Sequence, residues 1–409
     1  MKLSLISSEY IRQLPIDNIV FPKTTTNTYQ SCLKQLHNNI HSAYNAVFST
    51  SNISTIHLHI QPIHSPSDIP HPSTFDIHND IPIPISTAIK RNSAYTVSYT
   101  FTIHSQLVTV YFILEKHASD EVANIKNNIL RIQLWLHIAH QLKPCSTTLR
   151  IFIYLMSIPK LFPSSPTTTL DAVHVNSAFT RSCHSSNNEI VIFRSEEWFK
   201  VLIHETFHHY GFDFSTNHDR IDAQVKQLFG GKLISTINLY EAYCEFWAEY
   251  LNVCIGSYFL TKNDTNRQQV FVELVKLFMT YEIQFSYYQQ ACILSHMKID
   301  NYTSIWSTLK YKERTNVFSY YIIKLLFMQQ YPTFVVMCSK YGNTSRIFQF
   351  HDTEKNQQSI YQFIVANYKR NSHIHNSQVA ENIVQSTNAL FLRSLRMSIC
   401  DFHGGRSPP

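Results

Sequence analysis

Apolar and polar positions alternate in short runs along the first part of the chain, and a helical period dominates the rest. A hairpin is expected where two of the alternating runs are joined through His104-Ser105-Gln106. A helical pattern at 121–142 ends before Pro144, and residues 158–186, rich in Pro, Ser and Thr, predict a loop. The runs that predict strands are 55–60, 94–103, 107–114 and 149–155.

Residues 189–193 form a short apolar, β-branched run that predicts one more strand, and a helix is expected directly after it. Ser195 is the expected N-cap of this helix, with Glu196 and Glu197 in the first turn, where negative charge favours the helix dipole. Gly211 is expected to end the helix in a left-handed conformation. Further helices are predicted at 219–229, 237–259, 266–298, 313–329, 355–369 and 377–398.

The helix before Gly211 carries His204-Glu205-Thr206-Phe207-His208, a His-Glu-x-x-His motif. Side chains four residues apart project from the same face of a helix, so both imidazoles can reach one metal ion. Glu205 would then point towards the water that the ion holds, where it can accept a proton. The motif therefore predicts one zinc ion per chain.

Two histidines do not complete such a site, because catalytic zinc usually has three protein ligands and one open position. Glu241, Glu245 and Glu249 are spaced by four in the next strongly helical segment and form a stripe on one face. Like charges on one face repel one another, and a cation facing the stripe would remove that cost. The third ligand is therefore expected among these three glutamates.

With these two motifs, residues 189–255 resemble the zincin metallopeptidases, and within them the branch whose third zinc ligand is a glutamate. In that branch the ligand Glu is followed four residues later by an Asp or Glu that hydrogen-bonds a ligand histidine. The resemblance implies that Glu241 is the ligand and Glu245 the histidine's partner; the register one turn on, Glu245 with Glu249, stays open. The same residues also resemble uncharacterised zincin-like proteins encoded by large DNA viruses of protists.

The zincin resemblance implies an α+β fold, with an N-terminal sheet-plus-helix lobe, a central metal-binding helix and a largely helical C-terminal lobe. The corresponding division gives residues 1–145 to a β-rich region with one long helix. Residues 146–260 would form the catalytic core, and 261–409 the helical lobe.

A second zincin branch, the metzincins, begins with His-Glu-x-x-His-x-x-Gly, which residues 204–211 also satisfy. Its third ligand is a His, or in some members an Asp, three residues beyond the glycine. Phe214 occupies that position and cannot bind metal, and Asp213 is one residue out of register. His218 and Asp219 would need a different loop, so the glutamate branch is favoured.

The activity that the resemblance implies is hydrolysis of a polypeptide substrate, with Glu205 as general base for a zinc-activated water. The strand at 189–193 is the expected edge along which an extended peptide would add through main-chain hydrogen bonds. The oxyanion could be stabilised by His218, Tyr240, Tyr243 or Tyr250. The alternative of another class is a zincin fold kept as a structural or binding module, for example in a virion or a host-interaction complex, without proteolytic activity.

The charge and the cysteine content limit which partners and which cellular compartment are expected. The net charge is +6, spread without a polybasic run, so neither nucleic acid nor a membrane is an expected partner. Small basic clusters at 369–370 and 393–396 predict solvated faces. The eight cysteines include no C-x-x-C and suit free thiols in a reducing compartment. The N-terminus has no long apolar core and residues 317–328 are too short to span a bilayer, so a cytoplasmic protein is expected, in the host cytoplasm or the virion if it is viral.

Overall fold

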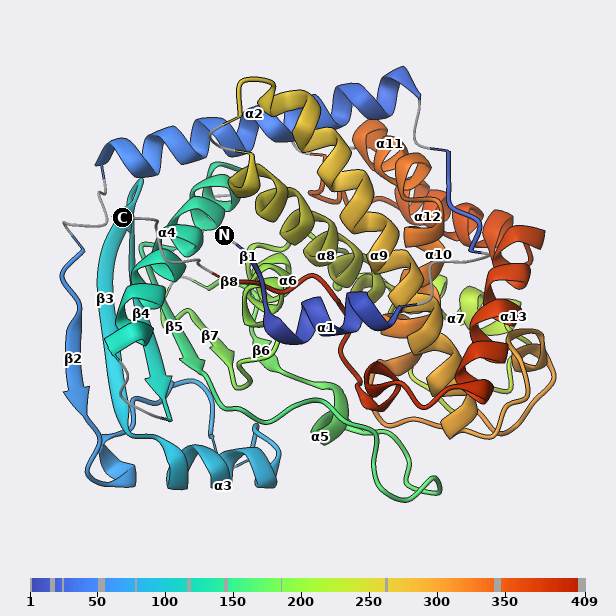
Figure 1. Ribbon diagram of the computed structural model, residues 1–409, viewed down its shortest axis with the longest axis horizontal. Coiled ribbons are helices and arrows are strands. Elements are labelled where there is room, and N and C mark those ends of the chain that lie inside the picture. Colours follow the sequence, from blue (N-terminus) through green and yellow to red (C-terminus); the bar gives the residue numbers. More distant parts are fainter. Residues whose placement is uncertain are drawn as a thin grey trace.

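The computed structural model combines a six-stranded sheet with a large body of helices, as the expected α+β class requires (Figure 1). The sheet lies on one side of the molecule, and the helices of the second half of the chain lie on the other. The structure describes residues 2–14, 19–23, 26–50, 56–77, 79–115, 119–142, 146–184, 186–261, 264–341 and 347–403.

The order of the strands across the sheet is β2 (His59–Pro62), β3 (Tyr95–Ile103), β4 (Gln106–Leu114), β5 (Thr148–Tyr154), β7 (Glu189–Ile192) and β6 (Ala178–Thr180). Strands β4, β5 and β7 are parallel, and the other pairs are antiparallel. The predicted hairpin is confirmed, because β3 and β4 pair along their whole length. Its turn places His104 in the left-handed region, at φ 52°.

The strand predicted at 189–193 is present as β7, but it is not at the edge of the sheet. Strand β6 pairs antiparallel with it, with Ala178 opposite Ile192 and Thr180 opposite Ile190. The expectation that a peptide would add along residues 189–193 is therefore wrong, since β6 already occupies that position. The available edge on this side of the sheet belongs to β6.

Alternate residues of the central strands enter two different hydrophobic clusters, as the two-residue period of a strand requires. On one face Val110, Ile151 and Ile190 join the main core, which also includes residues of the helices. On the opposite face Phe152 and Val191 join a smaller cluster, which α3 (Ile83–Asn92) covers. Both faces of the sheet are therefore buried.

The remaining helices are α1 (Leu5–Gln13), α2 (Asn27–Thr50), α4 (Ser119–Leu142), α5 (Ala172–Val175), α6 (Trp198–Tyr210), α7 (Asp219–Leu228), α8 (Leu239–Leu260), α9 (Arg267–His296), α10 (Lys324–Gln329), α11 (Tyr331–Tyr341), α12 (Glu354–Asn367) and α13 (Asn371–Ser386). Strands β1 (Lys2–Leu3) and β8 (Phe402–His403) pair near the two ends of the described chain. Helix α2 runs along the upper edge of the molecule in Figure 1. Helix α6 lies between the sheet and α8, which places it at the junction of the sheet and the helical body.

Helix α6 packs closely on α4. The Trp135 indole Nε1 donates to Thr206 Oγ1 over 2.7 Å, and the Trp135 ring stacks on Phe207 at 6.4 Å between centroids. These contacts fix the rotation of α6 about its own axis, because Thr206 and Phe207 must face α4. The next residue, His208, is thereby directed away from α4.

Several predicted elements differ from those observed. The first part of the chain is less strand-rich than expected, because α1, α2 and α3 were not predicted there, and α11 was missed later. The predicted loop 158–186 contains α5 and β6. The strand expected at 55–60 is β2, shifted to His59–Pro62, with residue 55 outside the described residues. The helix expected at 377–398 ends at Ser386, and the helix expected from 313 begins as the π-helix Phe318–Ile323. The division into three segments stays a prediction.

Two expectations about side chains are corrected. Arg396 is not on a solvated face: it is 1% exposed and lies near Glu196 and Asp401, at 3.6 and 3.5 Å. Cys183 is disulfide-bonded, so the cysteines are not all free thiols. The free, buried cysteines are Cys32, Cys244, Cys254, Cys292, Cys338 and Cys400.

Within the described ranges, no single helix has both the length and the apolar composition needed to cross a membrane. Two consecutive helical segments, Phe318–Gln329 and Tyr331–Lys340, are long and apolar enough only when taken together, and they are sharply bent at the break between them. The residues of Val317–Met328 are buried, as predicted for this apolar stretch.

Candidate metal centre

Helix α6 is held in place at both ends. Its N-cap is Glu197, at φ 57°, and not Ser195, whose hydroxyl instead donates to the carbonyl of Met156. The Glu197 carboxylate is buried and forms an ion pair with Lys160. At the other end Gly211 adopts the left-handed conformation that was predicted, with φ 59° and ψ 50°.

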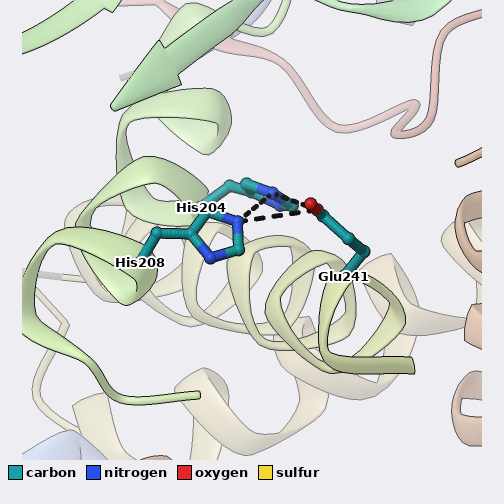
Figure 2. A group of neighbouring side chains, drawn as sticks. All are labelled: His204, His208 and Glu241. Atoms are coloured by element: carbon teal, nitrogen blue, oxygen red, sulfur yellow. Dashed lines mark hydrogen bonds and ion pairs between the residues drawn. The ribbon is translucent and has the colours of Figure 1, made fainter. Parts of the chain in front are cut away.

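His204 and His208 extend from α6 towards Glu241 in the first turn of α8 (Figure 2). His204 Nε2 lies 3.1 Å from His208 Nε2 and 3.2 Å from Glu241 Oε2, and His208 Nε2 lies 3.5 Å from the same oxygen. Two zinc–ligand bonds of about 2.0–2.1 Å that meet at the tetrahedral angle place their ligand atoms about 3.3 Å apart. The three atoms therefore have the spacing of three ligands of one zinc-sized ion, and the group could hold a metal ion.

The other two glutamates of the stripe have different partners. Glu245 Oε2 lies 2.9 Å from His204 Nδ1, and its other oxygen accepts a hydrogen bond from Lys200 Nζ at 2.5 Å. Glu249 is fully buried and lies 2.6 Å from Lys324 Nζ. The structure thus brings Glu241 to the imidazole Nε2 atoms, Glu245 to the back of His204, and Glu249 to a separate ion pair.

The residues considered for the metzincin register do not join this group. Phe214 is buried in the core, and His218 is paired with Asp222 over 2.5 Å. Asp213 reaches His208 from the opposite side of the ring: its Oδ2 lies 2.5 Å from Nδ1. Asp213 therefore contacts a candidate ligand and does not face the point where the Nε2 atoms meet.

A cleft of about 240 Å³ opens beside the three residues. Its walls include Val175–Thr180, which contain β6, and the face of α6 that carries Glu205. Tyr320, from the π-helix Phe318–Ile323, also lines it and donates a hydrogen bond from its hydroxyl to Glu241 Oε2 over 2.9 Å. The cleft thus has an edge strand on one wall and the candidate ligands on another.

Tyr320 was missed in the sequence, where the candidates for an oxyanion donor were His218, Tyr240, Tyr243 and Tyr250. Tyr243 is turned into the core, with its hydroxyl donating to the carbonyl of Phe348, and Tyr250 contacts Tyr29. None of the four predicted candidates, including His218 and Tyr240, is among the residues that line the cleft. The only sequence signal for Tyr320 was a pair of tyrosines inside an otherwise apolar run, and that signal does not identify a binding site.

The surroundings of the cleft change the proton affinity of its side chains. Burial raises the pKa of Glu205, and the nearby His204 and His208 offset this only in part. Burial would also raise the pKa of Glu241, but the contacts with His208 and His204 hold that pKa well below the usual range. Burial lowers the pKa of His204, but Glu241 and Glu245 raise it above its ordinary value. The carboxylates of Glu241 and Glu245 therefore favour positive charge at the imidazoles.

Comparison of the chain with protein-family models, curated proteins and solved structures gives no match. The case for a function therefore depends on the two sequence motifs and on the geometry of the cleft.

Proposed function

We propose that the protein is a zinc-dependent peptidase whose ion is held by His204, His208 and Glu241. The observation that carries the proposal is the 3.1–3.5 Å spacing of the three ligand atoms beside a cleft that contains Glu205. A site with a purely structural ion would not need a buried, non-ligand carboxylate next to it. His204, Glu205 and His208 also form an intact His-Glu-x-x-His motif, the pattern in which two histidines bind zinc and the glutamate acts as general base.

A zinc ion at this point would lower the pKa of a bound water and polarise the carbonyl to be cleaved. Glu205, which lines the same cleft, would accept the water's proton and pass it to the leaving amine. The hydroxyl of Tyr320 is a hydrogen-bond donor at the same end of the cleft, and it could turn from Glu241 to the developing oxyanion.

The substrate's place is suggested by the sheet. Strand β6 is the last strand in the order, and residues 175–180 form a wall of the cleft. An extended peptide that adds along β6 would make main-chain hydrogen bonds and pass over α6. We therefore propose β6, in place of residues 189–193, as the strand that binds the polypeptide substrate.

The proposal is tested by comparing wild type with Glu205→Gln on a broad peptide library, with zinc content measured in both. Gln is nearly isosteric with Glu but cannot accept the proton, so zinc should stay bound while cleavage falls about 10²- to 10⁴-fold. Glu273→Gln is the matched control, because Glu273 lies on the surface with its side chain 63% exposed. Equal cleavage by wild type and Glu205→Gln would exclude Glu205 as the general base. Zinc-loaded wild type without activity on any peptide would favour a structural or binding module.

A further inference from the structure

We propose that Asp213 is a positioning residue that fixes the orientation and the tautomer of His208. This inference depends on the proposed metal site, because a fixed Nε2 is useful only if that atom binds an ion. No feature of the sequence assigns this role to Asp213, since its spacing from the motif fits neither zincin branch.

Both carboxylate oxygens of Asp213 have hydrogen-bond partners. Oδ1 accepts hydrogen bonds from the backbone N–H and the hydroxyl of Ser215, at 3.1 and 2.9 Å. Oδ2 faces His208 Nδ1 at 2.5 Å, and the residue is only 6% exposed. The left-handed turn at Gly211 brings the chain back so that residue 213 lies behind the ring of His208.

This contact determines which nitrogen of His208 can bind an ion. A carboxylate accepts hydrogen bonds, so Nδ1 must carry the hydrogen that points to Asp213. Nε2 of the neutral ring then keeps its lone pair, and this is the atom that faces His204 and Glu241. The same arrangement of carboxylate, histidine and metal orients ligands in many zinc sites.

The same side chains could instead bind a second ion, because His208, Asp213 and Cys244 also form a compact group. Cys244 Sγ lies 3.8 Å from His208 Nδ1 and 3.6 Å from Asp213 Oδ2, which suits two ligands of one zinc ion. The 2.5 Å between Nδ1 and Oδ2 does not, since tetrahedral ligands with N and O donors lie about 3.3 Å apart. A distance this short is that of a hydrogen bond and not of two ligands of one ion, and it is shorter than the about 2.7–2.9 Å usual between a charged N–H donor and a carboxylate.

Asp213→Asn gives a specific test. The amide oxygen can keep both hydrogen bonds from Ser215, which turns the amide nitrogen towards His208 Nδ1. That nitrogen is a donor, so Nδ1 must become the acceptor and the hydrogen moves to Nε2, where it blocks the ion. Zinc affinity, measured by competition with a chelating dye, is expected to fall about 10- to 100-fold.

Asp222→Asn is the matched control. Asp222 makes an equally short contact with a histidine, His218 Nδ1 at 2.5 Å, and its other oxygen accepts the backbone N–H of Leu239. Asn can keep that backbone bond while losing the contact with His218, so zinc affinity should stay within about twofold of wild type. An NMR readout separates positioning from general damage: the zinc-loaded wild type should show a slowly exchanging His208 Nδ1–H, which Asp213→Asn lacks.

The outcomes are distinguishable. Wild type that binds no zinc would overturn the proposed function itself. Wild type that binds zinc, with Asp213→Asn of equal affinity and the Nδ1–H signal retained, would overturn only the role of Asp213. Two zinc ions per chain, one of them lost in Cys244→Ala, would replace it with the second-ion arrangement. If Asp213→Asn does not fold, Ser215→Ala decides, because it loosens Asp213 without removing the carboxylate: a smaller loss of affinity supports the role, and no loss overturns it.

Discussion

Glu313 is expected to make the stability of the protein fall as the pH rises from about 4.5 to about 8. The residue is 7% exposed, and its carboxyl accepts the backbone N–H of Phe318 at 2.8 Å and contacts the hydroxyl of Ser235. Phe318 begins the π-helix that brings Tyr320 to the cleft. Burial disfavours the ionised form of Glu313. The same carboxyl holds the start of the π-helix that carries Tyr320 into the candidate site.

The magnitude follows from the pKa. Burial raises the pKa of Glu313 from 4.5 to about 8 in the folded protein. Between these values the folded chain keeps the proton and the unfolded chain has released it, so stability decreases as the pH rises. Each pH unit is equivalent to about 1.4 kcal/mol, so the full loss is at most about 5 kcal/mol. Below pH 4.5 the stability that the protonated Glu313 confers is fully present, and above about pH 8 it is lost.

Glu313→Gln removes this dependence, because Gln is neutral at every pH and can still accept the N–H of Phe318. The free energy of unfolding would be measured for both proteins by urea titration at pH 5, 6, 7 and 8, with tryptophan fluorescence as the probe. The wild type should lose up to about 4 kcal/mol relative to the variant between pH 5 and pH 8. Parallel curves for the two proteins across this range would refute the assignment of a protonated Glu313.

Four further substitutions have defined expectations. Glu241→Ala should lose most of the zinc, whereas Glu249→Ala should keep it in whatever fraction folds; elemental analysis showing the reverse would move the ligand assignment along α8. Gly256→Ala should lower stability by about 1–3 kcal/mol, because a Cβ there would lie 2.4 Å from the ring of Phe402, and an unchanged melting temperature would contradict this close approach. Tyr320→Phe should keep zinc but reduce cleavage about 10²- to 10³-fold if its hydroxyl stabilises the oxyanion, and full activity would exclude that role.

Local patterns were sufficient for the elements that surround the motif. The hairpin of β3 and β4, the long helix α4 and the left-handed end of α6 at Gly211 all follow from residues close in sequence. Each has a signal of its own: alternation with a short turn, a helical period, or a glycine at the end of that period. These elements were predicted correctly because nothing distant in the chain overrides them.

The long helix α2 was missed although its signal was present. Its buried positions recur at helical spacing, but polar residues between them reduce the apparent hydrophobicity. The buried residues are Tyr29, Cys32, Leu33, Leu36, His37, Ile40, Ala43 and Val47. Periodicity was the correct indicator here, and mean polarity was misleading.

Other parts of the cleft could not be predicted from local patterns. Strand β6 has three residues inside a stretch rich in Pro, Ser and Thr, and only its pairing with β7 defines it as a strand. Tyr320 lies 79 residues from Glu241 in sequence, and a π-helix directs it to the cleft. Asp213 acts through a loop whose return path is set by tertiary packing. Each of these depends on contacts between distant residues, which the sequence does not display.

The glutamate stripe shows how the chain resolves the repulsion that its sequence predicted. A single cation was expected to face Glu241, Glu245 and Glu249, but these carboxylates lie on successive turns of α8 and extend over about 12 Å of helix axis, at 1.5 Å per residue. No single ion can neutralise all three. Lys200 lies beside Glu245 and Lys324 beside Glu249, both as buried ion pairs, while Glu241 meets the two imidazoles. Because each of the two deeper carboxylates is paired with a lysine, Glu241 is the member of the stripe that faces the two histidines, in the group that could hold a metal ion.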